Sequence, residues 1–183
     1  MLKDFYPLTP WRHDSVDSVW TAFAYDSKIV NNDLGTNSRA AAVHVNGGTL
    51  ERCTIADNKS GDATTVNGLY LASGRAVDCI VSGNSGYNTN ISGGGVYMGV
   101  ASLIGCVVSN NCNTSRYMNT PTTVSSAGVH MGGANGVVSN CTIVGNVNYS
   151  SCGINASGLA VVAANCKVYD TVIANNFSSN GAE

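Results

Sequence analysis

The sequence predicts an all-β protein, a single-stranded right-handed parallel β-helix (a solenoid) of about six coils. Three observations lead to this class. A short motif recurs every 26 to 35 residues along most of the 183-residue chain. Its apolar residues alternate with small or polar ones, as in strands with one buried face. The spacing leaves no room for a helix between strands, so the repeats can bury their apolar faces only by stacking.

The clearest element of the repeat is a strand that ends in asparagine. Its six copies, SKIVNN, CTIADN, CIVSGN, CVVSNN, CTIVGN and TVIANN, begin at residues 27, 53, 79, 106, 141 and 171. The first position is always small and the third is always β-branched, which favours a strand with its third residue in the core. The fifth and sixth positions hold Asn, Asp or Gly, which tolerate a left-handed backbone, so each strand should end in the same sharp turn.

Two further strand segments precede this element in most repeats. The earlier one has apolar first and third residues around a middle residue that should face outward; it covers residues 43–45, 69–71, 96–98, 129–131 and 159–161. The later one is marked by one inward apolar residue, at Leu50, Ala76, Leu103, Val138 and Val168. Each coil is therefore expected to contain three short strands.

The two ends of the stack are expected to differ. Val16, Val19, Trp20 and Phe23 have helical spacing, so residues 15–23 are predicted to form a short helix that caps the first coil, with a strand of that coil as the competing interpretation. The chain then divides into a cap and entry segment, 1–26, and repeats, 27–183. The last strand has no equivalent cap, which predicts end-to-end self-association or a missing C-terminal continuation.

The repeats also resemble those of a known superfamily. Gly94-Gly95-Val96 and the segment 108–111, VSNN, carry the likeness best. They resemble the right-handed β-helices of the pectate-lyase-like superfamily, and more specifically secreted bacterial proteins built on GGGVYM…C.I.GN units. They are also similar to the repeats of chlamydial polymorphic outer-membrane proteins, which carry Phe-x-x-Asn. The likeness covers about residues 27–176 and implies the fold; because the superfamily includes lyases, hydrolases, adhesins and stalks, it leaves function open.

Composition narrows the classes of partner. Only 11% of residues are charged, the formal net charge is −2, and no basic cluster occurs, which argues against nucleic acid. No apolar stretch is long enough for a membrane helix, so membrane insertion is not expected. Repeats rich in Asn, Ser, Thr and Gly are typical of secreted or cell-surface proteins, although the first 20 residues lack the apolar core of a signal peptide.

Two columns of identical residues should run along the stack. The sixth-position asparagines are expected to hydrogen-bond from coil to coil; they are Asn32, Asn58, Asn84, Asn111, Asn146 and Asn176. The first-position cysteines are expected to be reduced core thiols rather than metal ligands, because a linear column does not converge on a metal; they are Cys53, Cys79, Cys106 and Cys141. Cys112 and Cys152 fall in loops of adjacent coils, and a disulfide between them is left open.

Outward rings are the strongest candidates for a ligand site. The middle residues of four successive early strands are His44, Tyr70, Tyr97 and His130. A row of ring faces with polar tips suits a polysaccharide, and the alternative is that the rings only stabilise the sheet by stacking on one another. Longer coils at residues 85–92, 112–126 and 147–157 interrupt one corner beside these rings, and Arg116 and Tyr117 are predicted to assist binding there.

Catalysis has little support in the sequence. The 11 acidic residues are scattered, and the column of Asp26, Asp78 and Asp170 is interrupted by Arg52, Gly105 and Asn140. The sequence therefore favours a non-catalytic, exported β-helix with a carbohydrate-binding or adhesive face, without a cofactor or metal. The alternatives are a purely structural solenoid that assembles end to end, and a polysaccharide lyase or glycoside hydrolase.

Overall fold

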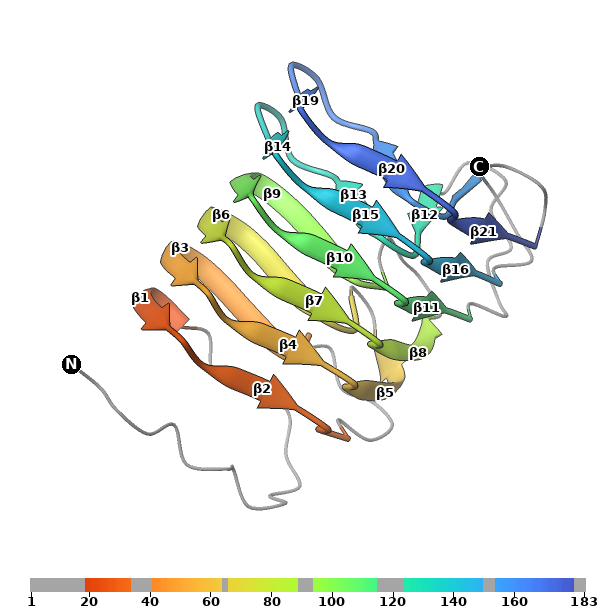
Figure 1. Ribbon diagram of the computed structural model, residues 1–183, viewed down its shortest axis with the longest axis horizontal. Coiled ribbons are helices and arrows are strands. Elements are labelled where there is room, and N and C mark those ends of the chain that lie inside the picture. The colour runs from red at the N-terminus through yellow and green to blue at the C-terminus, as the bar shows by residue number, and fades with distance from the viewer. Residues whose placement is uncertain are drawn as a thin grey trace.

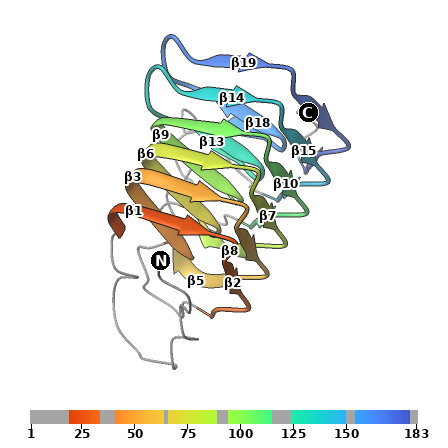
Figure 2. The same cartoon turned by 60° about the vertical axis from the view of Figure 1, so that its left-hand side comes forward.

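The computed structural model describes residues 19–33, 41–63, 66–88, 94–114, 124–149 and 154–179, and all of its regular elements are strands. Equivalent strands of successive turns lie side by side and run parallel, so that the chain winds as a β-solenoid (Figure 1). This confirms the predicted all-β solenoid class. Figure 2 shows the turns stacked from β1 and β2 at one end to β19 at the other.

Most strands belong to three parallel sheets. The first sheet contains β1 (Val19–Tyr25), β3 (Val43–Glu51), β6 (Leu69–Val77), β9 (Val96–Ile104), β13 (Val129–Met131), β14 (Val137–Ser139), β18 (Leu159–Val161) and β19 (Lys167–Tyr169). The second contains β2 (Lys28–Val30), β4 (Thr54–Ala56), β7 (Ile80–Ser82), β10 (Val107–Ser109), β15 (Thr142–Val144) and β20 (Val172–Ala174). The third contains β5 (Lys59–Ala63), β8 (Ser85–Asn88), β11 (Cys112–Asn113), β16 (Val147–Asn148) and β21 (Phe177–Ser178). A separate pair joins β12 (Val124–Ser126) to β17 (Ile154–Ala156).

Two details of the prediction need correction. In the second sheet, β4, β7, β10 and β15 have a neighbour on both sides, whereas β2 and β20 are edges, and the solenoid has about four turns rather than six. The expected helix over residues 15–23 is wrong where it can be seen, since Val19–Tyr25 form strand β1 and pair with β3. Residues 15–18 lie outside the described residues. Valine, tryptophan, threonine and phenylalanine suit a strand, and pairing with β3 supplies hydrogen bonds that an isolated helical turn lacks.

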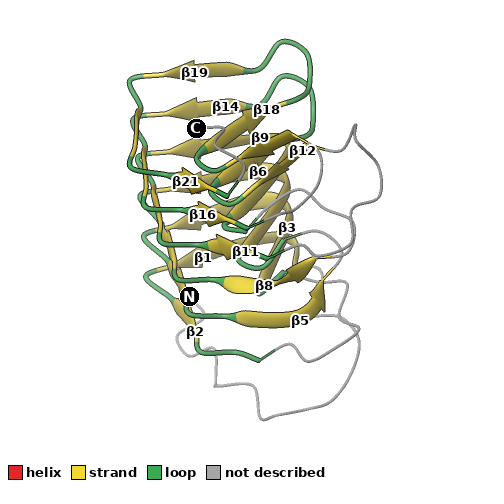
Figure 3. Cartoon of the chain, turned by 90° about the vertical axis from the view of Figure 1, so that its right-hand side faces the viewer, coloured by secondary structure: helices red, strands yellow, loops and turns green. Residues whose placement is uncertain are grey.

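The third sheet follows the asparagine of each repeat, where sequence reasoning placed only a corner (Figure 3). The two segments predicted before that asparagine are continuous in β3, β6 and β9, and they separate into β13 and β14 in the next turn. The break covers residues 132–136 and begins with Gly132 and Gly133. The insertions at residues 85–92, 112–126 and 147–157 begin with or contain the short strands of this third sheet.

The core holds the residues that the alternation predicted. The third-position residues Ile55, Val81, Val108 and Ile143 are all 0% exposed. The first-position thiols Cys53, Cys79, Cys106 and Cys141 are free and buried. Each thiol donates to the carbonyl two residues earlier, as Cys79 Sγ does to Val77 O at 3.2 Å. At the two ends of this column, the Ser27 and Thr171 hydroxyls make the same bond.

The surroundings of this thiol column shift the pKa values of neighbouring thiols in opposite directions. Hydrogen bonds to neighbouring thiols, together with burial, raise the pKa of Cys53 and Cys106. The same thiol–thiol hydrogen bonds lower the pKa of Cys79 and Cys141, so a charge in the column would reside there. Burial disfavours a thiolate at all four positions, but at Cys79 and Cys141 the hydrogen bonds outweigh it.

A left-handed backbone recurs at two positions in all six copies of the motif. One is the fifth position of the motif, as predicted, with positive φ at Asn31, Asp57, Gly83, Asn110, Gly145 and Asn175. The other is the residue before the first position, which sequence reasoning missed: Asp26, Arg52, Asp78, Gly105, Asn140 and Asp170, with φ of 50 to 63°. The sixth-position asparagines are not left-handed, so they serve another purpose.

These asparagines form a ladder inside the solenoid, hereafter the asparagine ladder. From Asn32 to Asn176, the side-chain Nδ2 of each donates to Oδ1 of the next at 2.7 to 3.0 Å. A glycine column packs against it: a Cβ at Gly68, Gly95, Gly128 or Gly158 would meet the Nδ2 of the ladder asparagine in its own repeat at 3.1 Å or less. Glycine thus precedes β6, β9, β13 and β18, where a Cβ would crowd the ladder, whereas Ala42 holds this position before β3.

Candidate functional site

The predicted ring column comes together on the first sheet. His44 of β3 pairs with Tyr70 of β6, Tyr70 with Tyr97 of β9, and Tyr97 with His130 of β13. The residues on either side of each ring, such as Leu69 and Leu71, are buried in the core, so the rings project from the other face. The next position in this column is Ala160 of β18, which is 4% exposed.

The rings stack on one another rather than facing solvent side by side. The Tyr70 and Tyr97 centroids lie 5.0 Å apart with planes 8° from parallel, and those of Tyr97 and His130 lie 5.3 Å apart at 11°. His44 meets Tyr70 edge-on at 4.6 Å and 72°. Both faces of Tyr97 are thus directed at neighbouring rings, which is the stacking alternative weighed from sequence. A sugar would have to contact ring edges and polar atoms instead of ring faces.

Burial changes the ionisation of two of these rings. His44, Tyr70 and Tyr97 are half-buried, and His130 is only 5% exposed. Burial lowers the pKa of His44, because it disfavours the imidazolium. Burial, and then the nearby Tyr70, raise the pKa of Tyr97. Both shifts favour the neutral forms of His44 and Tyr97, which suits an uncharged ligand or a purely structural role.

Gly132 makes room for the ring column at its far end. A Cβ added at Gly132 would collide with the hydroxyl and ring of Tyr97. A Cβ at Gly133 would collide with the backbone of Gly99 in the preceding turn. The Gly-Gly pair after β13 thus lets two turns approach closely beside the tyrosine.

The other predicted binding residues cannot be placed relative to the ring column. Arg116 and Tyr117 lie outside the described residues, as does Cys152. Cys112 is a free, half-buried thiol. At the same corner, Tyr149 is 53% exposed and meets Phe177 edge-on, with centroids 6.4 Å apart. The ligand-binding role of the ring column and of Arg116 and Tyr117 stays a prediction.

The interrupted column of Asp26, Asp78 and Asp170 lies at the second left-handed position, the residue before the first position of the motif. There Arg52 donates to both carboxylate oxygens of Asp26 in the neighbouring turn, at 2.7 and 3.0 Å, and also contacts Glu51. The hydrogen bond from Arg52 lowers the pKa of Asp26 and raises that of Arg52 itself. The pair is exposed, so its contribution to stability is small. Among the described residues, no three His, Cys, Asp or Glu side chains gather in a way that could hold a metal ion.

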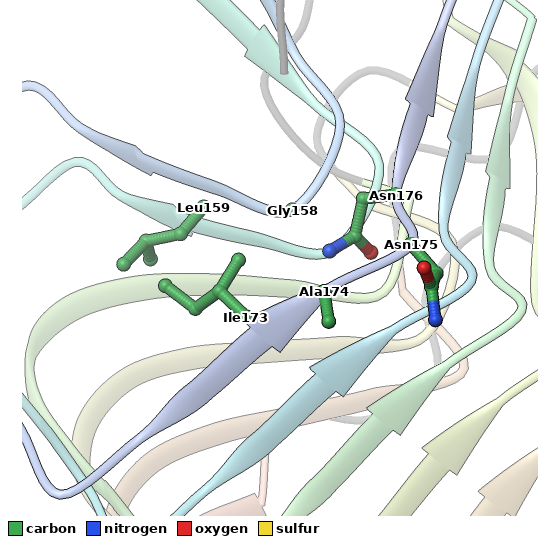
Figure 4. Close-up of a pocket in the computed structure, with 6 residues that line it drawn as sticks. All are labelled: Gly158, Leu159, Ile173, Ala174, Asn175 and Asn176. Atoms are coloured by element: carbon green, nitrogen blue, oxygen red, sulfur yellow. The ribbon is translucent and has the colours of Figure 1, made fainter.

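The last turn presents an uncovered section of core. Ile173 in β20 is 46% exposed, whereas its four interior equivalents are fully buried. Val161 and Val168, which continue two other core columns, are 49% and 39% exposed. Figure 4 shows the hollow at this end, lined by Gly158, Leu159, Ile173, Ala174, Asn175 and Asn176. Sequence reasoning expected an uncapped end here but did not single out these side chains.

Comparison of the chain with protein-family models, with curated proteins and with solved structures finds no match in any of the three. Within the described residues, no helix is long and apolar enough to cross a membrane. The function must therefore be argued from the geometry of the solenoid itself.

Proposed function

We propose that this chain is a non-catalytic structural segment, a stalk or fibre element, that docks its last turn on a further turn of β-solenoid. The observation that carries the proposal is the exposure of Ile173, at 46% against 0% for its interior equivalents. A core position that is half in water is what the next turn of a solenoid covers. As part of the same proposal we place the chain among exported or surface proteins of the pectate-lyase-like superfamily, on composition and motif.

The main chain supports docking at the same place. β20 and β21 are edges of their sheets, β18 ends the path of the first sheet, and β19 pairs only with β14. These edges have a row of peptide groups available for a parallel strand, and the apolar side chains beside them include Val172 and Phe177 at 59% and 56% exposed. Open strand edges beside uncovered core therefore favour the docking of a further turn.

Sedimentation velocity over a wide range of protein concentration tests this role. We expect the weight-average sedimentation coefficient to rise with concentration without saturating at a dimer, because an open end-to-end contact does not close. A monodisperse monomer at the highest concentrations would overturn the proposal.

Polysaccharide binding is a second candidate, favoured by the regular row of half-buried Tyr70 and Tyr97. Their spacing follows the coil repeat, and a glycan lying along the row would meet ring edges and hydroxyls. A glycan array read with wild type beside a Tyr70→Phe/Tyr97→Phe variant is the test, because phenylalanine keeps the stacking and removes only the hydroxyls. Wild-type binding that the variant loses supports the candidate; absence of wild-type binding removes it.

A further inference from the structure

The asparagine ladder has a direction, and its two ends are chemically different. Within the ladder, Asn84 donates from its backbone N–H and from Nδ2 to Oδ1 of Asn111, both at 3.0 Å. Its Nδ2 also donates back to the carbonyl of Ile55 in the preceding turn, at 3.0 Å. Each Oδ1 therefore faces the first turn of the solenoid. The backbone N–H and one Nδ2 hydrogen of each asparagine face the last turn.

At the first turn, the ladder ends in an acceptor. Asn32 donates from N and Nδ2 to Asn58 Oδ1, at 3.1 and 2.7 Å. No residue in the described part of the chain donates to Asn32 Oδ1.

At the last turn, the ladder ends in donors. Asn176 Oδ1 accepts from Asn146, and Asn176 Nδ2 donates to Ile143 O at 3.0 Å. No described residue accepts from the backbone N–H of Asn176. The two ends thus lack the groups that the other end provides.

We propose that a second copy of this chain stacks head to tail on the last turn, with Asn176 of one copy donating to Asn32 Oδ1 of the next. The inference rests on the structural role proposed above and adds the identity of the partner and the register. By the interior pattern, Asn32 Nδ2 of the next copy donates to Ile173 O. A tail-to-tail contact would instead bring donors against donors, so the contact is heterologous and open.

The register of the second sheet predicts the neighbours across this junction. Lys28 aligns with Thr54, Ile80, Val107, Thr142 and finally Val172. Continuing the same register places Val172 beside Lys28 of the next copy, and Ile173 beside Ile29. Ile29 is the half-buried end of the same core column in which Ile173 is 46% exposed, so each covers the other.

The first sheet adds one favourable and one unfavourable pair. Its register places Tyr169, 49% exposed, beside Tyr25 of the next copy, 47% exposed. It also brings Asp170 near Asp26 of the next copy. That Asp26 carboxylate is already bound by Arg52, which offsets the like-charge repulsion.

Two aspartate variants test whether the last turn is the contact. Ile173→Asp places a charge in the junction, and Ile80→Asp is its matched control, since Ile80 is 44% exposed in the same sheet but lies in an interior turn. In sedimentation velocity we expect Ile173→Asp to weaken association by about tenfold or more, because the charge becomes buried without a partner. We expect less than about a twofold change for Ile80→Asp. Equal effects of the two variants would overturn the inference.

A charge exchange tests the register and direction. Val172→Lys should weaken self-association, because the new lysine faces Lys28 of the next copy. Mixing fluorescently labelled Val172→Lys with unlabelled Lys28→Glu pairs opposite charges at this position. The labelled protein should then sediment in larger particles than it does alone. Failure of this mixture to recover association, while wild type still associates, overturns the head-to-tail register and leaves the proposed structural role standing. A wild type that stays monomeric overturns both. Circular dichroism of each variant shows that the fold is kept.

Discussion

The asparagine ladder makes a quantitative prediction at its centre, for the variant Asn111→Ala. The Asn111 side chain is fully buried and takes part in four hydrogen bonds. Its Oδ1 accepts from N and Nδ2 of Asn84, and its Nδ2 donates to Val81 O and to Asn146 Oδ1, all at 3.0 Å. Alanine removes all four, whereas the backbone N–H of Asn111 keeps its bond to Asn146 Oδ1.

The cost follows from the groups left without partners. Asn84 N–H loses the acceptor that the ladder gives it, the second Nδ2 hydrogen of Asn84 loses its acceptor, and Val81 O loses a donor. A buried polar group left unsatisfied costs about 1–3 kcal/mol, so three of them lower the free energy of unfolding by about 3–9 kcal/mol. This is a large part of the roughly 5–15 kcal/mol that stabilises a domain.

Urea unfolding followed by circular dichroism measures this loss, and the adjacent residue offers a matched control. Asn110 is exposed, has a φ of 55°, and corresponds to Gly83 and Gly145 in other turns. We expect Asn110→Gly to change the free energy of unfolding by less than about 1 kcal/mol. A loss below about 1 kcal/mol for Asn111→Ala, or an equal loss for both variants, would refute the argument that the ladder holds the turns together.

Three further predictions concern the turn, the ring column and the thiols. Gly83→Ala should lower the free energy of unfolding by about 1–2 kcal/mol, because φ is +64° and the new Cβ meets the Asp57 carboxylate; thermal unfolding measures this, and the added change Asp57→Ala should recover part of it. The raised pKa of Tyr97 means that the unfolded chain releases this proton first, so stability should fall above about pH 10, and Tyr97→Phe should reduce that fall in alkaline urea titrations. The thiols of Cys53, Cys79, Cys106 and Cys141, 0–2% exposed, should resist a water-soluble thiol reagent in native protein and react after unfolding; rapid native labelling of these four by peptide mapping would contradict their place in the core.

Local repetition explains why much of the fold could be predicted from sequence. Small and aliphatic residues at alternate positions, such as Cys53 and Ile55, define which face of a strand is buried, and both are at most 1% exposed. Six asparagines in register likewise predicted a ladder, since stacked copies bring identical side chains together. These features depend on one repeat unit and on the rule that units stack.

Features that depend on contacts between turns could not be predicted in the same way. The spacing of Val19 and Phe23 fits a helix, but pairing with β3 makes this segment a strand. The left-handed turn at Arg52 carries no signal in its own residue type, because arginine rarely adopts that conformation. Four outward rings were visible, but whether their faces meet solvent or one another depends on side-chain torsions, and here the rings stack.

The three columns, of asparagines, thiols and rings, share a consequence for where this molecule can act. Inside the stack each column satisfies itself: amides bond to amides, thiols to the carbonyls two residues before, and ring faces meet ring faces. The unpaired groups of the asparagine ladder and the uncovered core then lie where the columns stop, at Asn32 and at Asn176 beside Ile173. Since recognition needs groups that the fold has not already used, the ends of this solenoid have more capacity to bind than its sides. Because the ladder is directional, that capacity selects one orientation of the partner.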